Sequence, residues 1–366
     1  MKRQHIIPIV VVLLLSAWPR GRAQAISGIP GSLELGYAVR VDADSPQAVE
    51  SITAVASLGI DWVILDVHWD ALNHTPQGAY DLQALEQLSS QVEALGMHAV
   101  VSLSDAPDWA MTPDGPRPAA AAELVRQIAT LAPDTLLALE VFPMPNTLQG
   151  WGASPNPQAY VNLLQSMHTV LQEEASPMYL IVGGLLPLPQ THTSEDIAAT
   201  TFLKALYETG VQQYADIIGL AYPALNPAAD TPENAKSVLR AYSTLRLIML
   251  QYGHQNGTLW ITRLTWQPQQ PASSVQNWVQ SVYELFHNQV YIGLVAFDGA
   301  NASPERAVFL LGEDGNFTPV ADILGQTLAP FRNTGEATYY FYATGAPHQP
   351  ETFLHLRHTK KLRKKR

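Results

Sequence analysis

The chain contains no cysteine among its 366 residues. This absence excludes a disulfide framework, a thiolate metal site, a cysteine nucleophile and a lipid-modified cysteine. The phosphate-binding motif G-x-x-x-x-G-K-S/T, the zinc motif H-E-x-x-H and the nucleophile motif G-x-S-x-G are also absent. His355 and His358 are three residues apart, but they belong to a basic tail and we assign them to it. We therefore expect neither a metal nor a cofactor.

Basic residues are scarce in the body of the chain. Of 21 lysines and arginines, four lie in residues 1–22 and seven in residues 357–366, while neither segment contains an acidic residue. Residues 23–356 therefore carry 10 basic and 32 acidic residues, a net charge of −22. Such a body repels nucleic acid, which we exclude as a partner. The basic tail suits contact with an anionic surface, such as phospholipid or cell-wall polymer, or is a solvated tail.

Residues 1–25 have the pattern of an export signal. They begin with two basic residues, continue with the apolar stretch Ile6–Trp18 and end in an Ala-x-Ala site at residues 23–25. The apolar stretch is short for a membrane-spanning helix. We expect cleavage near residue 25 and a secreted or cell-surface protein, and an uncleaved membrane anchor is the alternative.

From about residue 33, short apolar runs alternate with amphipathic stretches. This rhythm is typical of βαβ units with a parallel sheet, and eight strands match a (β/α)8 TIM barrel of the α/β class. We predict one barrel domain over residues 26–332, followed by a C-terminal extension, residues 333–366, in which Thr338–Thr344 forms an extra strand. The predicted barrel strands are Leu33–Val41, Asp61–His68, His98–Ser104, Leu136–Phe142, Met178–Leu186, Asp216–Tyr222, Thr258–Leu264 and Val290–Phe297.

The stretches between these strands carry helix signals. Ser45 followed by Pro46 predicts an N-cap with proline at the first helical position, and Gly59 predicts the end of that helix. The next helix starts at Asp81 and stops at Gly96. The remaining predicted helices are Ala120–Leu131, Pro157–Glu173, Glu195–Tyr207, Asn234–Tyr252 and Ser273–His287.

Two segments resemble strands of the clan A glycoside hydrolases. Residues 139–146, Leu-Glu-Val-Phe-Pro-Met-Pro-Asn, resemble the fourth strand of that family, which usually reads E-x-W-N-E-P-N. Residues 260–266, Trp-Ile-Thr-Arg-Leu-Thr-Trp, resemble its seventh strand, usually W-I-T-E-x-G-W. The central Glu of the first motif is the family's acid/base and that of the second is its nucleophile. Here Met144 and Arg263 hold those two positions, and Pro143 replaces an Asn that usually holds the sugar 2-hydroxyl.

Further motifs follow in the family's order over residues 33–330, in particular that of the xylosidase/iduronidase-like and family-5-like members. Residues 59–69 resemble the second strand, G-x-x-W-V-R-x-D-x-x-W. Residues 216–223 resemble the sixth, although the usual His is Ala221, and residues 310–319 resemble the closing G-L-x-x-x-D-G-x-x-x-P-A. The resemblance implies a TIM barrel with a carbohydrate site at the carboxyl ends of its strands.

The substitutions bear directly on the chemistry that the resemblance implies. A retaining glycosidase needs two carboxyl groups roughly 5–5.5 Å apart. The thioether of Met144 neither donates a useful proton nor attacks, and cationic Arg263 opposes an oxocarbenium-like transition state. Our first hypothesis is an inactive barrel that binds a glycan or a protein partner at the former active-site face. A second is an active O-glycosyl hydrolase with relocated carboxylates, and a third is a scaffold anchored by its terminal segments.

Relocated acids would stand near predicted strand ends. Asp105 and Asp298 lie where barrel loops begin, which is where catalytic residues usually lie, although each is also readily explained as an exposed or capping residue. Glu140 shares a strand face with Met144 but lies about two layers deeper, so we interpret it as a buried structural group. The other carboxylates near strand ends are Asp66 and Asp70.

A degenerate site still has residues that suit a sugar. Aromatic faces stack on sugar rings, but rings at a barrel mouth also plug it, and both interpretations stay open. Arg263 suits an anionic ligand, or forms an internal salt bridge to an acid such as Glu140 or Asp66. The candidate ligand-binding residues are Asp66, His68, Trp69, Asn146, Trp151, Tyr222 and Trp266, and Trp109 is a further aromatic near a strand end.

Overall fold

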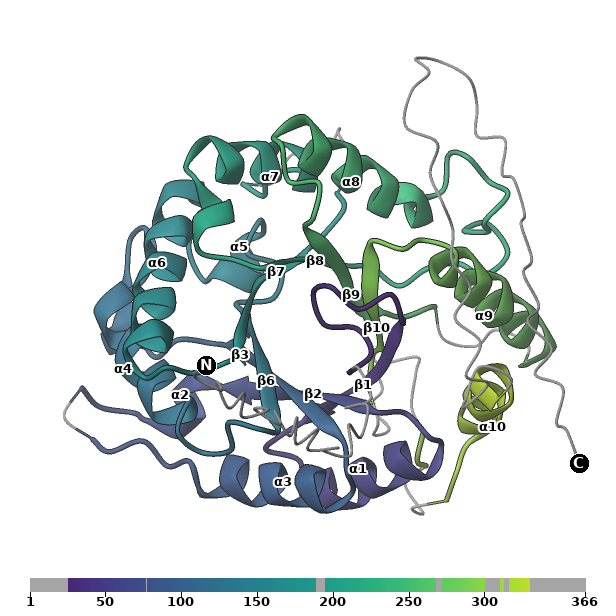
Figure 1. Cartoon of the computed structure of the whole chain (residues 1–366), viewed down its shortest axis with the longest axis horizontal. Helices are drawn as coiled ribbons and strands as arrows, with labels where there is room; N and C mark the ends of the chain where they lie inside the picture. The colour runs from purple at the N-terminus through teal and green to yellow at the C-terminus, as the bar shows by residue number, and fades with distance from the viewer. Residues whose placement is uncertain are drawn as a thin grey trace, which may run out of the picture.

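The computed structural model describes residues 26–76, 78–188, 195–267, 272–299, 310–312 and 316–329. Eight parallel strands form a closed barrel in the order β1-β10-β9-β8-β7-β6-β3-β2 (Figure 1). This confirms the predicted (β/α)8 fold. The strands are β1 (Gly36–Asp42), β2 (Trp62–His68), β3 (His98–Ser104), β6 (Leu136–Val141), β7 (Tyr179–Leu185), β8 (Ile217–Ala221), β9 (Thr258–Leu264) and β10 (Ile292–Phe297).

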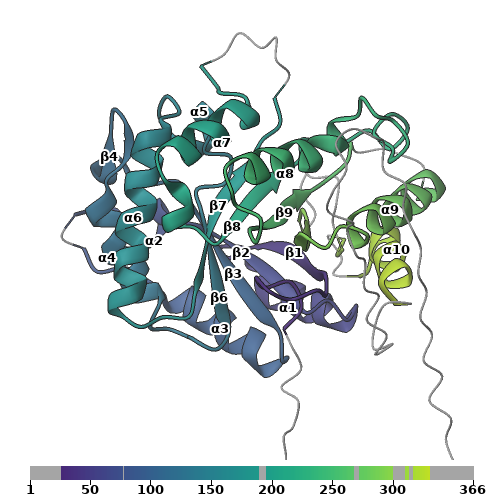
Figure 2. The same cartoon turned by 45° about the horizontal axis from the view of Figure 1, so that its top comes forward.

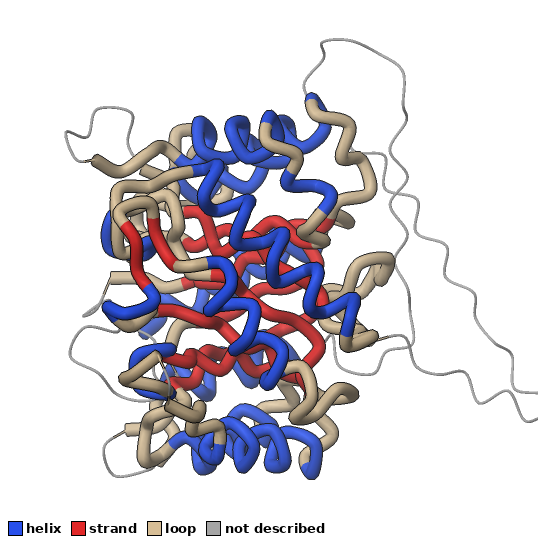
Figure 3. Tube along the Cα trace, turned by 90° about the vertical axis from the view of Figure 1, so that its left-hand side faces the viewer, coloured by secondary structure: helices blue, strands red, loops and turns tan. Residues whose placement is uncertain are grey.

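Helices surround the barrel on its outside (Figure 3). The first begins at Ala48 and not at Pro46, because Ser45 and Pro46 form a turn in which the amide of Ala48 donates to the carbonyl of Ser45 at 3.0 Å. The main helices are α1 (Ala48–Ser57), α3 (Gln83–Ala94), α4 (Pro118–Ile128), α6 (Pro157–Glu173), α7 (Ala199–Glu208), α8 (Ala241–Gln251), α9 (Ala272–His287) and α10 (Pro319–Leu328).

Short elements lie mostly in the loops that follow the strands. They are the helices α2 (Trp69–Leu72) and α5 (Leu148–Trp151), the 3-10 turns η1 (Asp108–Ala110), η2 (Val211–Gln213) and η3 (Val238–Arg240), and the strands β4 (Met111–Thr112) and β5 (Gly115–Pro116). The last two pair as an antiparallel hairpin that lies near α6 at the edge of the barrel (Figure 2). Because α2, α5 and η1 all follow barrel strands, they surround the carboxyl-terminal mouth, where barrel enzymes place their sites.

The barrel interior is closed at the amino-terminal end. Trp62 and Trp260 meet there edge to face at 5.6 Å, and their indole nitrogens donate to the carbonyls of Ser27 and Gly28 at 3.0 and 2.9 Å. The loop that carries these carbonyls enters the barrel, as the purple segment in Figure 1 shows. Gly28 adopts φ +88°, which disfavours other residues. The amino-terminal end of the barrel is therefore covered by the chain itself.

Several sequence predictions fall outside the described residues. These are the export signal over residues 1–25, the C-terminal extension over residues 333–366 and its strand Thr338–Thr344. Among the helices that the structure describes, none is both long and apolar enough to cross a membrane.

Candidate functional site

Met144 and Arg263 face each other at the barrel mouth. Met144 follows the end of β6 by three residues, and Arg263 is the penultimate residue of β9. Both side chains are partly buried, and the Arg263 Nη1 lies 4.0 Å from the Met144 Sδ. The two positions that the family resemblance assigns to the catalytic carboxylates are thus in contact. The fold preserves their meeting across the mouth, but the contact joins a guanidinium to a thioether.

A β-bulge directs Arg263 toward the mouth. Strict alternation along β9 places Trp260 and Thr262 inside the barrel and would place Arg263 outside. However, β9 carries one extra residue near 262–263 relative to both neighbouring strands. A bulge of this kind re-aims a side chain and is common beside active sites. The opposite wall is irregular too, because Phe142 and Met144 adopt φ +53° and +58°.

A buried ion network lies beneath this pair and is centred on Arg40 of β1. Its Nη1 donates to Glu140 Oε2 at 2.9 Å, its Nη2 donates to Ser102 Oγ at 2.8 Å, and its guanidinium also forms an ion pair with Asp66. Glu140 accepts a further hydrogen bond from the amide of Gly184 at 3.0 Å. Arg40 pairs with both acids. Asp66 is therefore not free to bind a ligand, although the sequence predicted it as a ligand-binding residue. We call this network, together with Met144, Arg263 and the neighbouring Asp298, the mouth centre.

The network fixes the charge of Glu140. Burial alone would raise the pKa of its carboxyl group, but the nearby Arg40 guanidinium and the hydrogen bonds from its neighbours outweigh burial and lower it. Burial likewise disfavours the charge of Arg40, yet Asp66 and Glu140 raise the pKa of its guanidinium above the usual value. Glu140 is fully buried and ionised, so it is a structural group, as its depth along the strand predicted.

Arg263 is itself paired within the chain. Its Nε lies 3.5 Å from Asp298 Oδ2, just beyond the end of β10. An internal salt bridge of Arg263 was one of the two predicted alternatives, and the structure confirms it. Its partner is Asp298 and not Glu140 or Asp66, because Arg40 already pairs with those two acids. One oxygen of Asp298, Oδ1, is buried and has no hydrogen-bond partner among the described residues. Arg263 therefore brings little uncompensated positive charge to the mouth.

His68 and Asp105 form a second charged pair at the ends of β2 and β3. His68 Nδ1 lies 2.6 Å from Asp105 Oδ2, which also accepts a hydrogen bond from Ser104 at 2.7 Å. The hydrogen bond to Asp105 raises the pKa of His68 to about 9, and it lowers the pKa of Asp105. At neutral pH the pair is therefore an imidazolium and a carboxylate. Of the predicted ligand-binding residues His68 keeps the most exposed side chain, at 37%.

One cluster offers a set of possible metal ligands. Asp42, Asp44 and His68 present ligand atoms that all lie within 4.8 Å of one another. The sequence analysis had no signal for it, because the residues come from β1, the loop after it and the end of β2. A metal would require neutral His68, whereas the bond to Asp105 favours its protonated form. The cluster alone does not assign a metal.

The predicted aromatic platform is mostly buried. Trp69, Trp151, Tyr222 and Trp266 are at most 3% exposed, so their ring faces contact protein. Trp69 packs between Trp109 and Phe142, and Phe142 packs against Trp151 in turn. This corrects the stacking role expected for these four rings and favours the alternative in which barrel-mouth aromatics plug the site.

Asn146 is also committed to the fold. It is buried, and its side-chain amide donates to the carbonyls of Leu186 and Ile197 at 2.9 and 2.8 Å. Its carbonyl oxygen accepts from the amide of Leu186 at 2.9 Å. With its hydrogen-bonding groups used in this way, Asn146 braces the loops after β6 and β7, which argues against the ligand-binding role predicted for it from the sequence.

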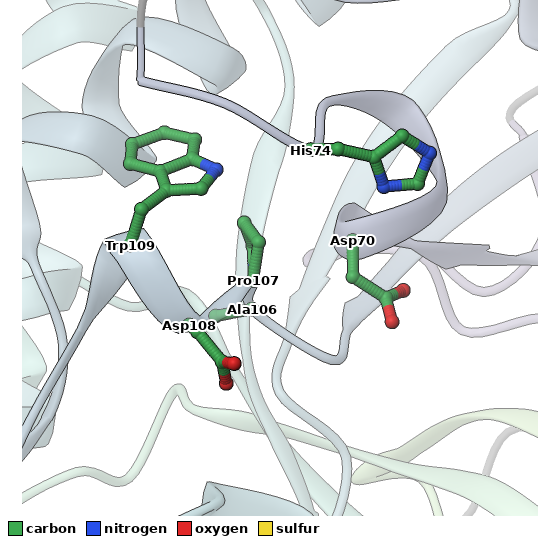
Figure 4. Close-up of a pocket in the computed structure, with 6 residues that line it drawn as sticks. All are labelled: Asp70, His74, Ala106, Pro107, Asp108 and Trp109. Carbon is green, nitrogen blue, oxygen red and sulfur yellow. The ribbon is translucent and has the colours of Figure 1, made fainter.

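A cavity of about 420 Å³ lies beside the mouth centre, between α2 with its following loop and η1. We call it the α2–η1 pocket. Figure 4 shows Asp70 and His74 on one side of it and Asp108 and Trp109 on the other. The sequence analysis noted Asp70 and Trp109 near strand ends but missed His74 and Asp108. The sequence provides little indication of these two residues, because they lie in two separate loops that come together only when the barrel closes. The lining residues are Asp70, His74, Ala106, Pro107, Asp108 and Trp109.

Comparison with known proteins supports the fold. No family model matches the sequence, and no curated protein matches it. Among solved structures, GH5_18 from Streptomyces cattleya in complex with GlcNAc has a TM-score of 0.62 and 15% identity, over 83% of this chain and 82% of that one. The GH39 enzyme from Xanthomonas axonopodis pv. citri has a TM-score of 0.60 and 14% identity, over 83% and 68% of the two chains.

A third neighbour is XacCel5A in complex with cellopentaose. It has a TM-score of 0.55 and 14% identity, and the match covers 81% of this chain and all of that one. At such low identities the likeness establishes the architecture and not the activity. The closed barrel, its strand order and these neighbours lead to one conclusion: the chain has the (β/α)8 fold of the clan A glycoside hydrolases.

Proposed function

We propose that this chain is a non-catalytic carbohydrate-binding protein built on a glycoside hydrolase barrel. The observation that carries the proposal is the contact between Met144 and Arg263, at 4.0 Å, at the two positions where the family resemblance places its acid/base and nucleophile. Two structural neighbours are complexes with the carbohydrates GlcNAc and cellopentaose, which supports a glycan as the ligand. A protein partner at the same face is the competing occupant.

The chemistry of the mouth centre supports the loss of hydrolysis. Double displacement needs one carboxyl group that donates a proton and a carboxylate that attacks. Neither Met144 nor Arg263 supplies such a group, and a guanidinium repels the positive charge that develops on the sugar. Nearby, Glu140 and Asp66 are held by Arg40, and Asp298 by Arg263. The carboxylates of the mouth centre thus balance internal cations.

An active hydrolase with relocated acids is the second candidate. Asp105 and Asp298 are its residues, and the unpaired Oδ1 of Asp298 is the feature that favours it. Asp105 is a poor general acid, because its bond to His68 lowers its pKa. Protonated His68 opposes the positive charge of a glycosyl transition state in the same way as Arg263. These arguments favour the non-catalytic proposal.

We also propose that the protein acts outside the cytoplasm, at the cell surface or beyond it. The export pattern of residues 1–25 supports this location, and the basic residues 357–366 suit contact with anionic phospholipid or cell-wall polymer. Mass spectrometry of the secreted chain tests the proposal. We expect a mature N-terminus near residue 26, whereas an intact N-terminus in the membrane fraction would indicate an anchor.

The proposed function is tested by two measurements on one preparation of the mature chain. A panel of chromogenic glycosides should show no turnover, and a glycan array should show saturable binding. The double variant Met144→Glu, Arg263→Glu restores the two carboxyl groups and should gain weak hydrolysis. Turnover by the unaltered chain that disappears in Asp105→Asn or Asp298→Asn would instead establish relocated acids. Absence of both turnover and glycan binding would favour a protein partner.

A further inference from the structure

The α2–η1 pocket is an open cavity large enough to hold part of a small ligand. Its volume of about 420 Å³ lies in the range of small-molecule pockets. Asp70 belongs to α2 and His74 to the loop after it, while Asp108 and Trp109 belong to η1 (Figure 4). Two loops that follow neighbouring strands thus form opposite walls of the pocket. The site is separate from the Met144–Arg263 contact.

The carboxylates of this pocket are not used by the fold. Asp70 and Asp108 are exposed, and neither side chain makes a hydrogen bond or ion pair with any other residue that the structure describes. The mouth centre is different, because Asp66, Glu140 and Asp298 each face an arginine. Carboxylates that stabilise no internal cation are available to bind an external one.

The charges around the pocket are mainly negative. Asp44 lies close enough to Asp70 to feel its charge. His68 and Asp105 balance each other, whereas Arg117, which donates to the backbone carbonyl of Trp109 at 3.1 Å, keeps its positive charge. The carboxylates of Asp44, Asp70 and Asp108 outnumber this one cation. This field attracts a cationic ligand and repels an anionic one.

Trp109 gives the pocket a fixed aromatic wall. Its indole nitrogen donates to the carbonyl of Asn73 at 3.2 Å, and its ring meets Trp69 edge to face at 6.0 Å. These contacts hold the ring while its side chain remains partly exposed. An indole face stacks on the apolar face of a pyranose and attracts a cation close to the ring.

We propose that the α2–η1 pocket binds an amino-sugar residue of a glycan with free amino groups. Its ammonium group meets Asp70 and Asp108 while its ring lies on Trp109. The inference rests on the proposed carbohydrate binding and names the class of glycan. A uronic acid glycan, which Arg263 alone would suggest, is disfavoured because Asp298 compensates that arginine and the pocket beside it is acidic. A neutral or N-acetylated glycan leaves both carboxylates without a partner.

Calorimetric titration of the full mature chain tests this inference. Four tetrasaccharides serve as probes at about pH 6.5, where aspartates are ionised: β-1,4-linked glucosamine, β-1,4-linked N-acetylglucosamine, cellotetraose and an oligogalacturonate. We expect glucosamine tetramer to bind best. Asp70→Asn combined with Asp108→Asn should weaken that binding about tenfold, as the loss of two accessible ion pairs allows. Higher salt should also weaken it, because accessible ion pairs are screened.

Controls separate a local effect from a folding defect. Asp134→Asn removes an exposed carboxylate at the start of β6, at the opposite end of the barrel, and should leave binding unchanged. Trp109→Phe keeps an aromatic face and should retain more affinity than Trp109→Ala. If cellotetraose or the N-acetylated tetramer binds as tightly as glucosamine tetramer, the inference fails and carbohydrate binding stands. If the Asp70, Asp108 variant binds normally, the pocket assignment fails. If no saccharide binds, the proposed function fails with it.

Discussion

The mouth centre and the α2–η1 pocket lie side by side at the same end of the barrel, and both are rich in carboxylates. In the mouth centre, Asp66 and Glu140 meet Arg40, and Asp298 meets Arg263. In the pocket, the side chains of Asp70 and Asp108 form no hydrogen bond or ion pair with another described residue. The first region has almost no charge left for a ligand. The second has charge that the fold does not use.

This difference indicates how the barrel accommodates carboxylates at its centre. An unpaired charge inside a barrel is costly, so the remaining acids need cations close by. Arg40 and Arg263 supply those cations from β1 and β9. At the rim, water solvates the carboxylates of Asp70 and Asp108, so these acids need no internal cation. The carboxylates of the centre are therefore held by internal cations, while those at the rim remain accessible.

The sharpest test of this contrast compares matched amide substitutions in the two regions. Glu140→Gln removes a buried charge that Arg40, Ser102 and the Gly184 amide surround, and we expect it to lower the free energy of unfolding by about 3 kcal/mol. Asp108→Asn, in the solvated pocket, should change it by less than about 0.5 kcal/mol. Urea denaturation measures both. If the two substitutions change the free energy of unfolding equally, Glu140 contributes no more to the stability of the fold than Asp108 does, and the contrast between the two regions is wrong.

A second test addresses the close packing of the mouth centre. Gly184 lies in β7, and a Cβ placed on it would lie 2.2 Å from Thr262 Oγ1. We expect Gly184→Ala to destabilise the barrel by about 2 kcal/mol through overpacking and a displaced Glu140 hydrogen bond. Gly325→Ala in α10 is the matched control, because its Cβ would meet Leu58 only at 3.4 Å. If Gly184→Ala unfolds at the same midpoint temperature as the unaltered chain, β7 accommodates the added methyl group without a loss of stability.

The barrel was predictable because its signals are local. The alternation of apolar runs and helix patterns located β3 and β9 to the residue, and the segment order predicted a TIM barrel. The motifs also placed Met144 and Arg263 at facing strand ends. The Arg40 network could not be predicted from the sequence, because Arg40 lies 26 residues from Asp66 and 100 from Glu140, and only barrel closure brings them together.

Burial and side-chain direction were harder to predict. A tryptophan near a strand end signals an aromatic mouth but not whether its face meets sugar or protein, and Trp69, Trp151 and Trp266 meet protein. The bulge in β9 that turns Arg263 inward has no distinctive sequence pattern. The α2–η1 pocket depends on the approach of two loops, so Asp108 and His74 carried no signal when considered alone.

The smallest expected effect concerns His68, which lies between the two regions. Its bond to Asp105 raises its pKa from 6.5 to about 9, so this pair stabilises the fold fully below pH 6.5 and loses that contribution as the pH rises through about 9. On the acid side, the lowered pKa of Asp105 keeps it ionised, so the contribution is lost only when strong acid protonates this carboxylate. Both side chains are more than a third exposed, so the contribution is under about 1 kcal/mol.

The pH dependence of this pair can be measured in two ways. NMR titration of the His68 ring should give a pKa near 9 that falls in Asp105→Asn. In urea denaturation, the stability difference between the unaltered chain and Asp105→Asn should shrink between about pH 6.5 and 9.5. Asp134→Asn should show no such trend. If the pKa of His68 instead lies near its usual value, Asp105 does not pair with His68. Asp105 would then belong with the accessible carboxylates of the rim and not with the paired acids of the mouth centre.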